Sequence, residues 1–125
     1  MNLNQVTVPA LDVAASVAFY RKLGLELIVS SPHYARLQCP TGESTFSVHL
    51  VGELLAPSST VVYFETASLD EQVKLLQQRG MVFSQEPRDE PWLWREARVS
   101  DPSGNVICLY SAGVNRLKPP WRVRS

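Results

Sequence analysis

The stretch QVTVPALDVAASVAFYRKLGL, residues 5–25, defines the structural unit of this chain, because a second stretch of the same layout follows it. It contains a strand-like segment at 5–8, a helical segment at 12–22 and a stop at Gly24. The later stretch VVYFETASLDEQVKLLQQRGM, residues 61–81, repeats this order of strand, helix and glycine stop. Such a repeat predicts two copies of one supersecondary unit, neither of which can bury its apolar face alone.

Both predicted helices carry start signals. Asp12 is a good N-cap for the first helix, which Gly24 ends. The second helix opens at Ser68, and Glu71 can complete a capping box by reaching back to the Ser68 amide. The residues of this helix that we expect to face inward are Val73, Leu75 and Leu76.

The size and charge of the chain exclude several classes of function. Its 125 residues suit one compact domain with a single core. Twelve basic residues balance twelve acidic ones, whereas a nucleic-acid partner would require a basic excess. No apolar run approaches the roughly 18 residues of a membrane span, and the N-terminus lacks the pattern of a signal peptide. Cys39 and Cys108, in a chain without such a signal, are typical of the reducing cytoplasm.

Composition also suggests where the chain divides. We expect a single domain over residues 1–112, built from modules 1–52 and 59–112, with a linker at Pro57-Ser58-Ser59. Residues 113–125 then form a basic tail, in which Pro119-Pro120-Trp121 favours an extended path.

Period-two alternation in the strand-like segments separates an apolar face from a polar one. Phe46 and Val48, for example, alternate with Ser47 and His49. The helices need apolar sheet faces to cover, so the polar faces are left to line a concave surface that can bind a small molecule. The predicted polar set consists of Gln5, Thr7, Tyr34, Arg36, Gln38, Ser47, His49, Tyr63, Glu65, Trp94, Glu96, Arg98, Cys108 and Tyr110.

Two motifs resemble a known superfamily. VAASVAFYRKLGL, residues 13–25, resembles the first helix of the vicinal oxygen chelate superfamily, which contains glyoxalase I, bleomycin resistance proteins, fosfomycin resistance proteins and extradiol dioxygenases. REARVSDPSGN, residues 95–105, resembles its penultimate hairpin, whose turn usually reads Asp-Pro-Asp-Gly-Asn. The resemblance covers residues 3–112 and implies an α+β fold of two βαβββ modules that form a half-open barrel.

The resemblance also implies where a metal would bind. Metal enzymes of the superfamily place ligands on the first and last strand of each module, which by position are Gln5, His49, Val61 and Cys108 here. Val61 has no donor atom, so a divalent metal (Zn, Ni, Fe or Mn) would depend on Gln5, His49 and Cys108. Cys108 can equally be a small buried hydrophobe.

The remaining candidates come from the polar face. Glu96 and Arg98 are candidate catalytic residues, because a desolvated carboxylate suits general acid or base work. The alternative is that these two residues form a structural ion pair. The candidate ligand-binding residues are Arg36, Tyr63, Glu65, Trp94 and Tyr110.

Two functions are compatible with these residues. One is a lyase or dioxygenase whose divalent metal is held by Gln5, His49 and a third group, either Cys108 or a cavity glutamate. The metal would stabilise an enolate or vicinal oxygens of the substrate. The other is a metal-free protein that binds a small molecule in a concave cleft, and the missing donor at Val61 favours it. In either case we expect a cytoplasmic homodimer without nucleic-acid or membrane partners, because pairing covers exposed sheet edges.

Overall fold

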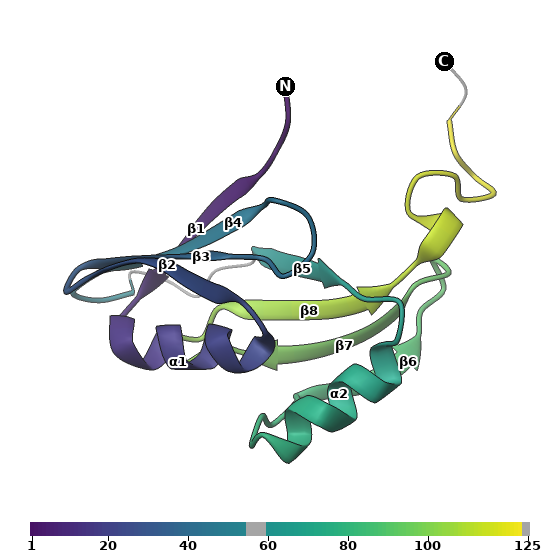
Figure 1. The fold of residues 1–125 in the computed structure, drawn as a ribbon. Helices are drawn as coiled ribbons and strands as arrows, with labels where there is room; N and C mark the ends of the chain where they lie inside the picture. Colours follow the sequence, from purple (N-terminus) through teal and green to yellow (C-terminus); the bar gives the residue numbers. More distant parts are fainter. Residues whose placement is uncertain (55–59, 124–125) are drawn as a thin grey trace. The chain divides into compact units, whose positions relative to one another are not determined.

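The computed structural model of the protein describes residues 1–54 and 60–123 (Figure 1). The predicted linker Pro57-Ser58-Ser59 therefore lies outside the described residues, as does Arg124 of the tail. None of the described helices is long and apolar enough to cross a membrane. The chain forms two compact units: unit 1 comprises Met1–Ser59 with Asp101–Asn105, and unit 2 comprises Thr60–Ser100 with Val106–Ser125.

Unit 1 is a four-stranded sheet with one helix on one face (Figure 1). The sheet order is β1-β4-β3-β2, with β1 parallel to β4 and the other neighbours antiparallel. Its elements are β1 (Gln5–Ala10), α1 (Val13–Leu23), β2 (Glu26–Ser31), β3 (Tyr34–Gln38) and β4 (Thr45–Leu50).

Unit 2 repeats this topology with the order β5-β8-β7-β6, and β5 is parallel to β8. Its elements are β5 (Val61–Glu65), α2 (Leu69–Gln78), β6 (Gln85–Asp89), β7 (Arg95–Ser100), β8 (Val106–Ser111) and the 3₁₀ turn η1 (Gly113–Asn115). The predicted α+β class and the two βαβββ modules are confirmed. The described strands pair within two separate sheets and do not close into one barrel sheet.

The first helix forms as predicted. The Asp12 carboxylate accepts the amide hydrogen of Ala15 at 3.0 Å, and Gly24 ends the helix in the left-handed region at φ 118°. Tyr20 and Leu23 are buried on its inner face. The sheet face toward this helix is apolar, with Ala35, Leu37, Phe46 and Val48 buried.

The second helix departs from the prediction in two details. Leu75 was expected to face inward, but it is 40% exposed, because Leu69, Val73 and Leu76 are the residues whose spacing forms one stripe on the helix. The predicted capping box is also wrong: the Ser68 side chain makes no cap bond, and its amide donates to Thr66 Oγ1 at 3.4 Å.

The turn between β7 and β8 is anchored in unit 1. Asp101 is 4% exposed, and its carboxylate accepts the Tyr20 hydroxyl at 2.6 Å and the Ser103 amide at 2.9 Å. Asn105 donates to the same carboxylate from its backbone at 2.9 Å and from its side chain at 2.8 Å. Burial, together with the bond to Asp101, raises the pKa of Tyr20 far above its ordinary value.

We predict that Tyr20→Phe lowers the free energy of unfolding by about 1–3 kcal/mol, because it removes a hydrogen-bond donor from a buried carboxylate. Urea unfolding measures this loss. Tyr63→Phe is the matched control: Tyr63 is 44% exposed, so its loss should stay within about 0.5 kcal/mol. Equal effects of the two variants would contradict the anchoring role of Tyr20.

Candidate functional site

The polar face of unit 1 is a connected hydrogen-bond network. Gln5 Nε2 donates to Ser47 Oγ at 2.7 Å, and the Tyr34 hydroxyl lies 2.6 Å from the same oxygen. Arg36 Nε donates to the Tyr34 hydroxyl at 3.0 Å. These contacts place on one face the side chains that alternation assigned to it, while Phe46 and Val48 are buried on the other.

The strand register does not bring Gln5 and His49 together. Gln5 pairs with Thr45, whereas His49 pairs with Pro9 and, on its other side, with Tyr34. Four residues of strand separate the two positions, which is about 13 Å. Of Ser47 and His49, Ser47 is the residue that bonds to the Gln5 side chain.

The repeat shows which residue of unit 1 is equivalent to Cys108 of unit 2. In unit 1, Ser47 lies two residues beyond Thr45, the partner of Gln5. In unit 2, Cys108 lies two residues beyond Val106, the partner of Val61. Ser47 is therefore the counterpart of Cys108. A shift of two residues keeps a side chain on the same face, so alternation alone could not separate Ser47 from His49.

In unit 2, Glu96 of β7 is the centre of a buried polar cluster. It is 1% exposed, and its carboxylate accepts the Trp92 indole N–H at 2.6 Å. Arg98 Nη2 lies 3.4 Å from Glu96 Oε1, and the Cys108 thiol donates to that oxygen at 3.6 Å. These contacts agree with the structural alternative for Glu96 and Arg98, and a catalytic role for the pair stays a prediction.

Trp92 is a partner of Glu96 that the sequence did not single out for this role. It lies in the β6–β7 loop, where Leu93 N–H donates to the Glu90 carbonyl at 3.0 Å and Leu93 adopts φ 67°. A bulky residue is uncommon in this left-handed region, where three-residue hairpin loops usually carry glycine. The sequence Pro91-Trp92-Leu93 contains no glycine or asparagine that would predict a left-handed residue at this position.

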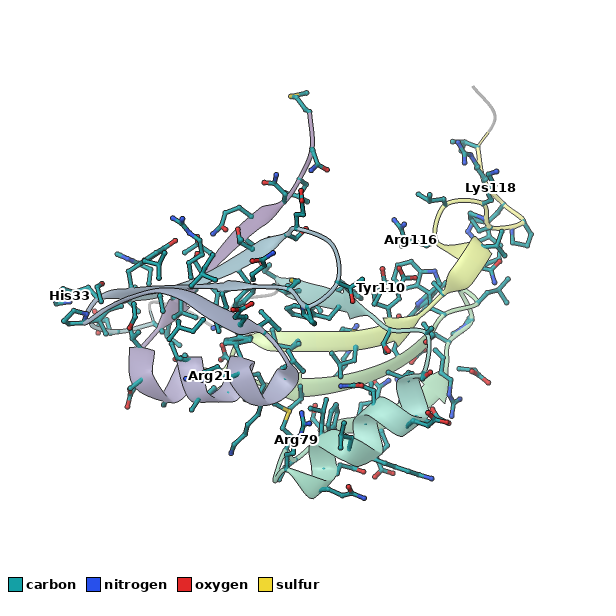
Figure 2. The ribbon with its side chains drawn as sticks, in the orientation of Figure 1. Arg21, His33, Arg79, Tyr110, Arg116 and Lys118 are labelled. Atoms are coloured by element: carbon teal, nitrogen blue, oxygen red, sulfur yellow. The ribbon has the colours of Figure 1, made fainter. Side chains whose placement is uncertain are left out.

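Three predicted ligand-binding residues of unit 2 form an aromatic cluster. The rings of Trp94 and Tyr110 stack with centroids 4.5 Å apart, and Tyr63 meets both edge-on at 5.9 and 5.7 Å. Figure 2 labels Tyr110 on β8 and Arg116 in the segment that follows it. Arg116 pairs with Glu65 at 3.6 Å, so the beginning of the tail contacts the strand that carries Tyr63.

The donor atoms at the family's metal positions do not fit a divalent metal. Both ends of the Gln5 amide are bonded, its oxygen by Thr45 Oγ1 and its nitrogen by Ser47. Val61 contributes no donor, and burial, followed by nearby Glu96, raises the pKa of the Cys108 thiol to about 12. A metal needs the thiolate, which is therefore scarce at neutral pH. The described residues contain no cluster of three His, Cys, Asp or Glu side chains able to hold an ion.

A family comparison agrees with the topology. The sequence profile described as "Glyoxalase/Bleomycin resistance protein/Dioxygenase superfamily" matches residues 2–109. The chain belongs to this superfamily. The resemblance found in the sequence is thereby confirmed, whereas the search of curated proteins gives no match.

Solved structures share the superfamily fold. A glyoxalase/bleomycin resistance protein/dioxygenase from Nocardioides has a TM-score of 0.78 and 24% identity, covering 99% of this chain and 90% of its own. TioX from Micromonospora sp. ML1 has a TM-score of 0.69 and 21% identity, covering 90% and 99%. A bleomycin resistance determinant encoded on the transposon Tn5 has a TM-score of 0.76 and 18% identity, covering 90% and 99%. Identities this low show a common fold and give no information about ligands.

We predict that Glu96→Gln lowers the free energy of unfolding by roughly 2–3 kcal/mol, because the amide nitrogen of glutamine cannot accept the bonds that the carboxylate accepts. Thermal and urea unfolding measure this change. Glu65→Gln is the matched control, since Glu65 is 41% exposed in its pair with Arg116 and should contribute less than about 1 kcal/mol. Little loss for Glu96→Gln would instead favour a solvated carboxylate available for acid or base work.

Proposed function

We propose that this superfamily member binds a small molecule without the family metal. The observation that carries the proposal is the donor set at the family's ligand positions. If Ser47, which the register makes equivalent to Cys108, replaces His49, the set is Gln5 and Ser47 in unit 1 and Val61 and Cys108 in unit 2. This set has no carboxylate and no imidazole, and its thiol is held protonated, so first-row metals have little to bind.

The polar face of each unit, taken by itself, carries groups that suit small-molecule recognition. Unit 2 presents the partly exposed Tyr63 ring beside the stacked Trp94–Tyr110 pair, which suits a flat or apolar part of a ligand. Unit 1 presents hydrogen-bonding groups around Tyr34 and Arg36. Apolar surface with a few fixed polar groups is the usual composition of a ligand site.

The alternative is a metal-dependent lyase or dioxygenase that uses Gln5, His49 and a third ligand. It would require the Gln5 amide to leave Thr45 and Ser47, and His49 to reach across about 13 Å of strand. No feature of the described residues favours this arrangement over the metal-free one.

Metal analysis tests the proposal. Protein purified without added metal or chelator should contain well below one Zn, Ni, Fe or Mn ion per chain. Adding each ion should also leave the unfolding temperature unchanged, because binding to the folded state alone would raise it.

Stoichiometric metal would overturn the metal-free reading. His49→Ala would then show whether the histidine is a ligand, through loss of that metal. The matched control is His33→Ala, since His33 lies in the β2–β3 turn (Figure 2). Loss of metal in both variants would point to nonspecific binding.

We further propose that the protein is a cytoplasmic homodimer in which the tail contributes to pairing. The tail carries large apolar side chains that are strongly exposed, with Trp121 57% and Val123 85% exposed. Exposed apolar groups close together are typical of surfaces that another chain covers.

Light scattering at micromolar concentration tests the dimer. We expect the unmodified chain to be dimeric. The double variant Trp121→Ser, Val123→Ser should dissociate into monomers at a higher protein concentration, because it loses apolar area at the interface. Val82→Ser is the matched control, since Val82 is also 85% exposed but follows α2. A monomeric unmodified chain would contradict the dimer, and an unaffected double variant would contradict the role of the tail.

A further inference from the structure

The hydroxyl oxygen of Tyr34 is the point in unit 1 where two donors converge. It lies 2.6 Å from Ser47 Oγ, and Arg36 Nε donates to it at 3.0 Å. Tyr34 and Arg36 are two residues apart on β3 and therefore share a face, with the guanidinium carbon 5.5 Å from the centre of the Tyr34 ring.

The direction of the bond between Tyr34 and Ser47 follows from the donors around the serine. Thr45 Oγ1 donates to the oxygen of the Gln5 amide, which leaves the amide nitrogen to donate to Ser47 at 2.7 Å. Ser47 is fully buried, and among the described residues the acceptor for its hydroxyl hydrogen is the Tyr34 oxygen. Because buried hydroxyls use their hydrogen when an acceptor is in reach, Ser47 donates to Tyr34.

The phenolic hydrogen of Tyr34 is therefore left for another partner. Its oxygen accepts from Ser47 and from Arg36, which fills both acceptor positions. The bond from Ser47, together with Arg36 and against the opposing effect of burial, lowers the pKa of Tyr34. A phenol that loses its proton more easily is also a stronger hydrogen-bond donor.

The guanidinium of Arg36 also has N–H groups that are available to a ligand. Its Nε atom is bonded to Tyr34, and within the described part of the chain it makes no ion pair with a carboxylate. Four other arginines, by contrast, each pair with a carboxylate: Arg88, Arg95, Arg98 and Arg116. The strand neighbours of the pair carry no negative charge, since His49 and Ser31 flank Tyr34, and Ser47 and Val29 flank Arg36.

We propose that Tyr34 and Arg36 form an oxyanion site, which binds the carboxylate or phosphate group of the small-molecule ligand. The phenolic hydrogen and the Nη atoms of the guanidinium are the donors, and no carboxylate of residues 1–54 or 60–123 forms an ion pair with the guanidinium. The inference rests on the proposed small-molecule function and names the chemical class that unit 1 recognises. The two proposals have separate tests. Finding bound metal would overturn the metal-free proposal without affecting the oxyanion site, and a failed anion test would overturn the oxyanion site without showing that metal is bound.

The first test follows the ionisation of Tyr34 by tyrosinate absorbance between about pH 8 and pH 12. Burial raises the pKa of Tyr20 and Tyr110, so Tyr34 should ionise before these two. Tyr34→Phe should remove this early phase, and Ser47→Ala should move it to higher pH, because the phenolate loses a donor. An early phase that Ser47→Ala leaves in place would show that Ser47 does not donate to Tyr34, and would overturn the proposal.

The second test adds the anions themselves. Inorganic phosphate or acetate, compared with chloride at equal ionic strength, should raise the pKa of Tyr34 by about half a unit or more, because a bound negative charge disfavours the phenolate. The response should be lost in Arg36→Gln and weakened in Arg36→Lys, which keeps the charge without the planar fork. Arg21→Gln is the matched control and should respond like the unmodified protein, since Arg21 lies on α1, which covers the other face of this sheet (Figure 2).

The pattern of responses identifies the ligand group. A response to acetate alone indicates a carboxylate, a response to phosphate alone indicates a phosphate, and a response to both supports the oxyanion site in its general form. No response to either anion, or a response that persists in Arg36→Gln, overturns the proposal. Circular dichroism shows whether each variant is folded. If Ser47→Ala does not fold, the Arg36 variants still test the proposal, because Arg36 is exposed and its substitution should leave the fold intact.

Discussion

The buried carboxylate of Asp101 is the group on which the packing of unit 1 depends most. It is almost completely removed from water, and it persists there because four donors surround it: the Tyr20 hydroxyl, the Ser103 amide and two groups of Asn105. A buried charge without such partners would be strongly destabilising. The turn that carries Asp101 packs with unit 1, although the strands on either side of it, β7 and β8, belong to unit 2. Two further bonds hold the turn in place, from Asn105 Nδ2 to the Pro9 carbonyl at 2.9 Å and from the Leu11 amide to Ser103 Oγ at 2.9 Å.

The same principle governs the polar faces of the two sheets. A buried polar group must find a partner, and in this chain the partners come from the face itself. Ser47 takes the place that Cys108 takes in the other repeat, and each bonds to neighbours on its own sheet. In unit 1 the chain joins the Gln5 amide to the hydroxyls of Ser47 and Tyr34, and in unit 2 it joins the Cys108 thiol to the Glu96 carboxylate. The chemistry left open to a ligand is therefore that of hydrogen bonds, aromatic rings and the guanidinium of Arg36.

Much of the fold could be predicted from short segments. The Asp12 cap, the left-handed Gly24 and the alternation of β4 are local features, and each was found where the sequence placed it. The inward face of α2 was only partly predicted, because Leu75 and Leu76 are adjacent in sequence but point about 100° apart around a helix. The capping box at Ser68 failed because the backbone amide found Thr66 instead. Trp92 could not be assigned to Glu96, since their contact depends on the unusual backbone of Leu93.

The repeat, the two helices, the superfamily and the faces of β1, β3, β4, β5, β7 and β8 could be read from the sequence, because these follow from local preferences and from periodicity. The sequence did not determine which residues on each face meet. Gln5 could have paired with Ser47 or with His49, since both lie on one side of β4 and differ only in position along it. Strand register determines which of these two residues lies beside Gln5, and register is set by the packing of whole strands against the helix and against each other. Tertiary structure alone therefore decided that Ser47 joins Gln5 to Tyr34, that His49 stands apart, and that Glu96 is buried.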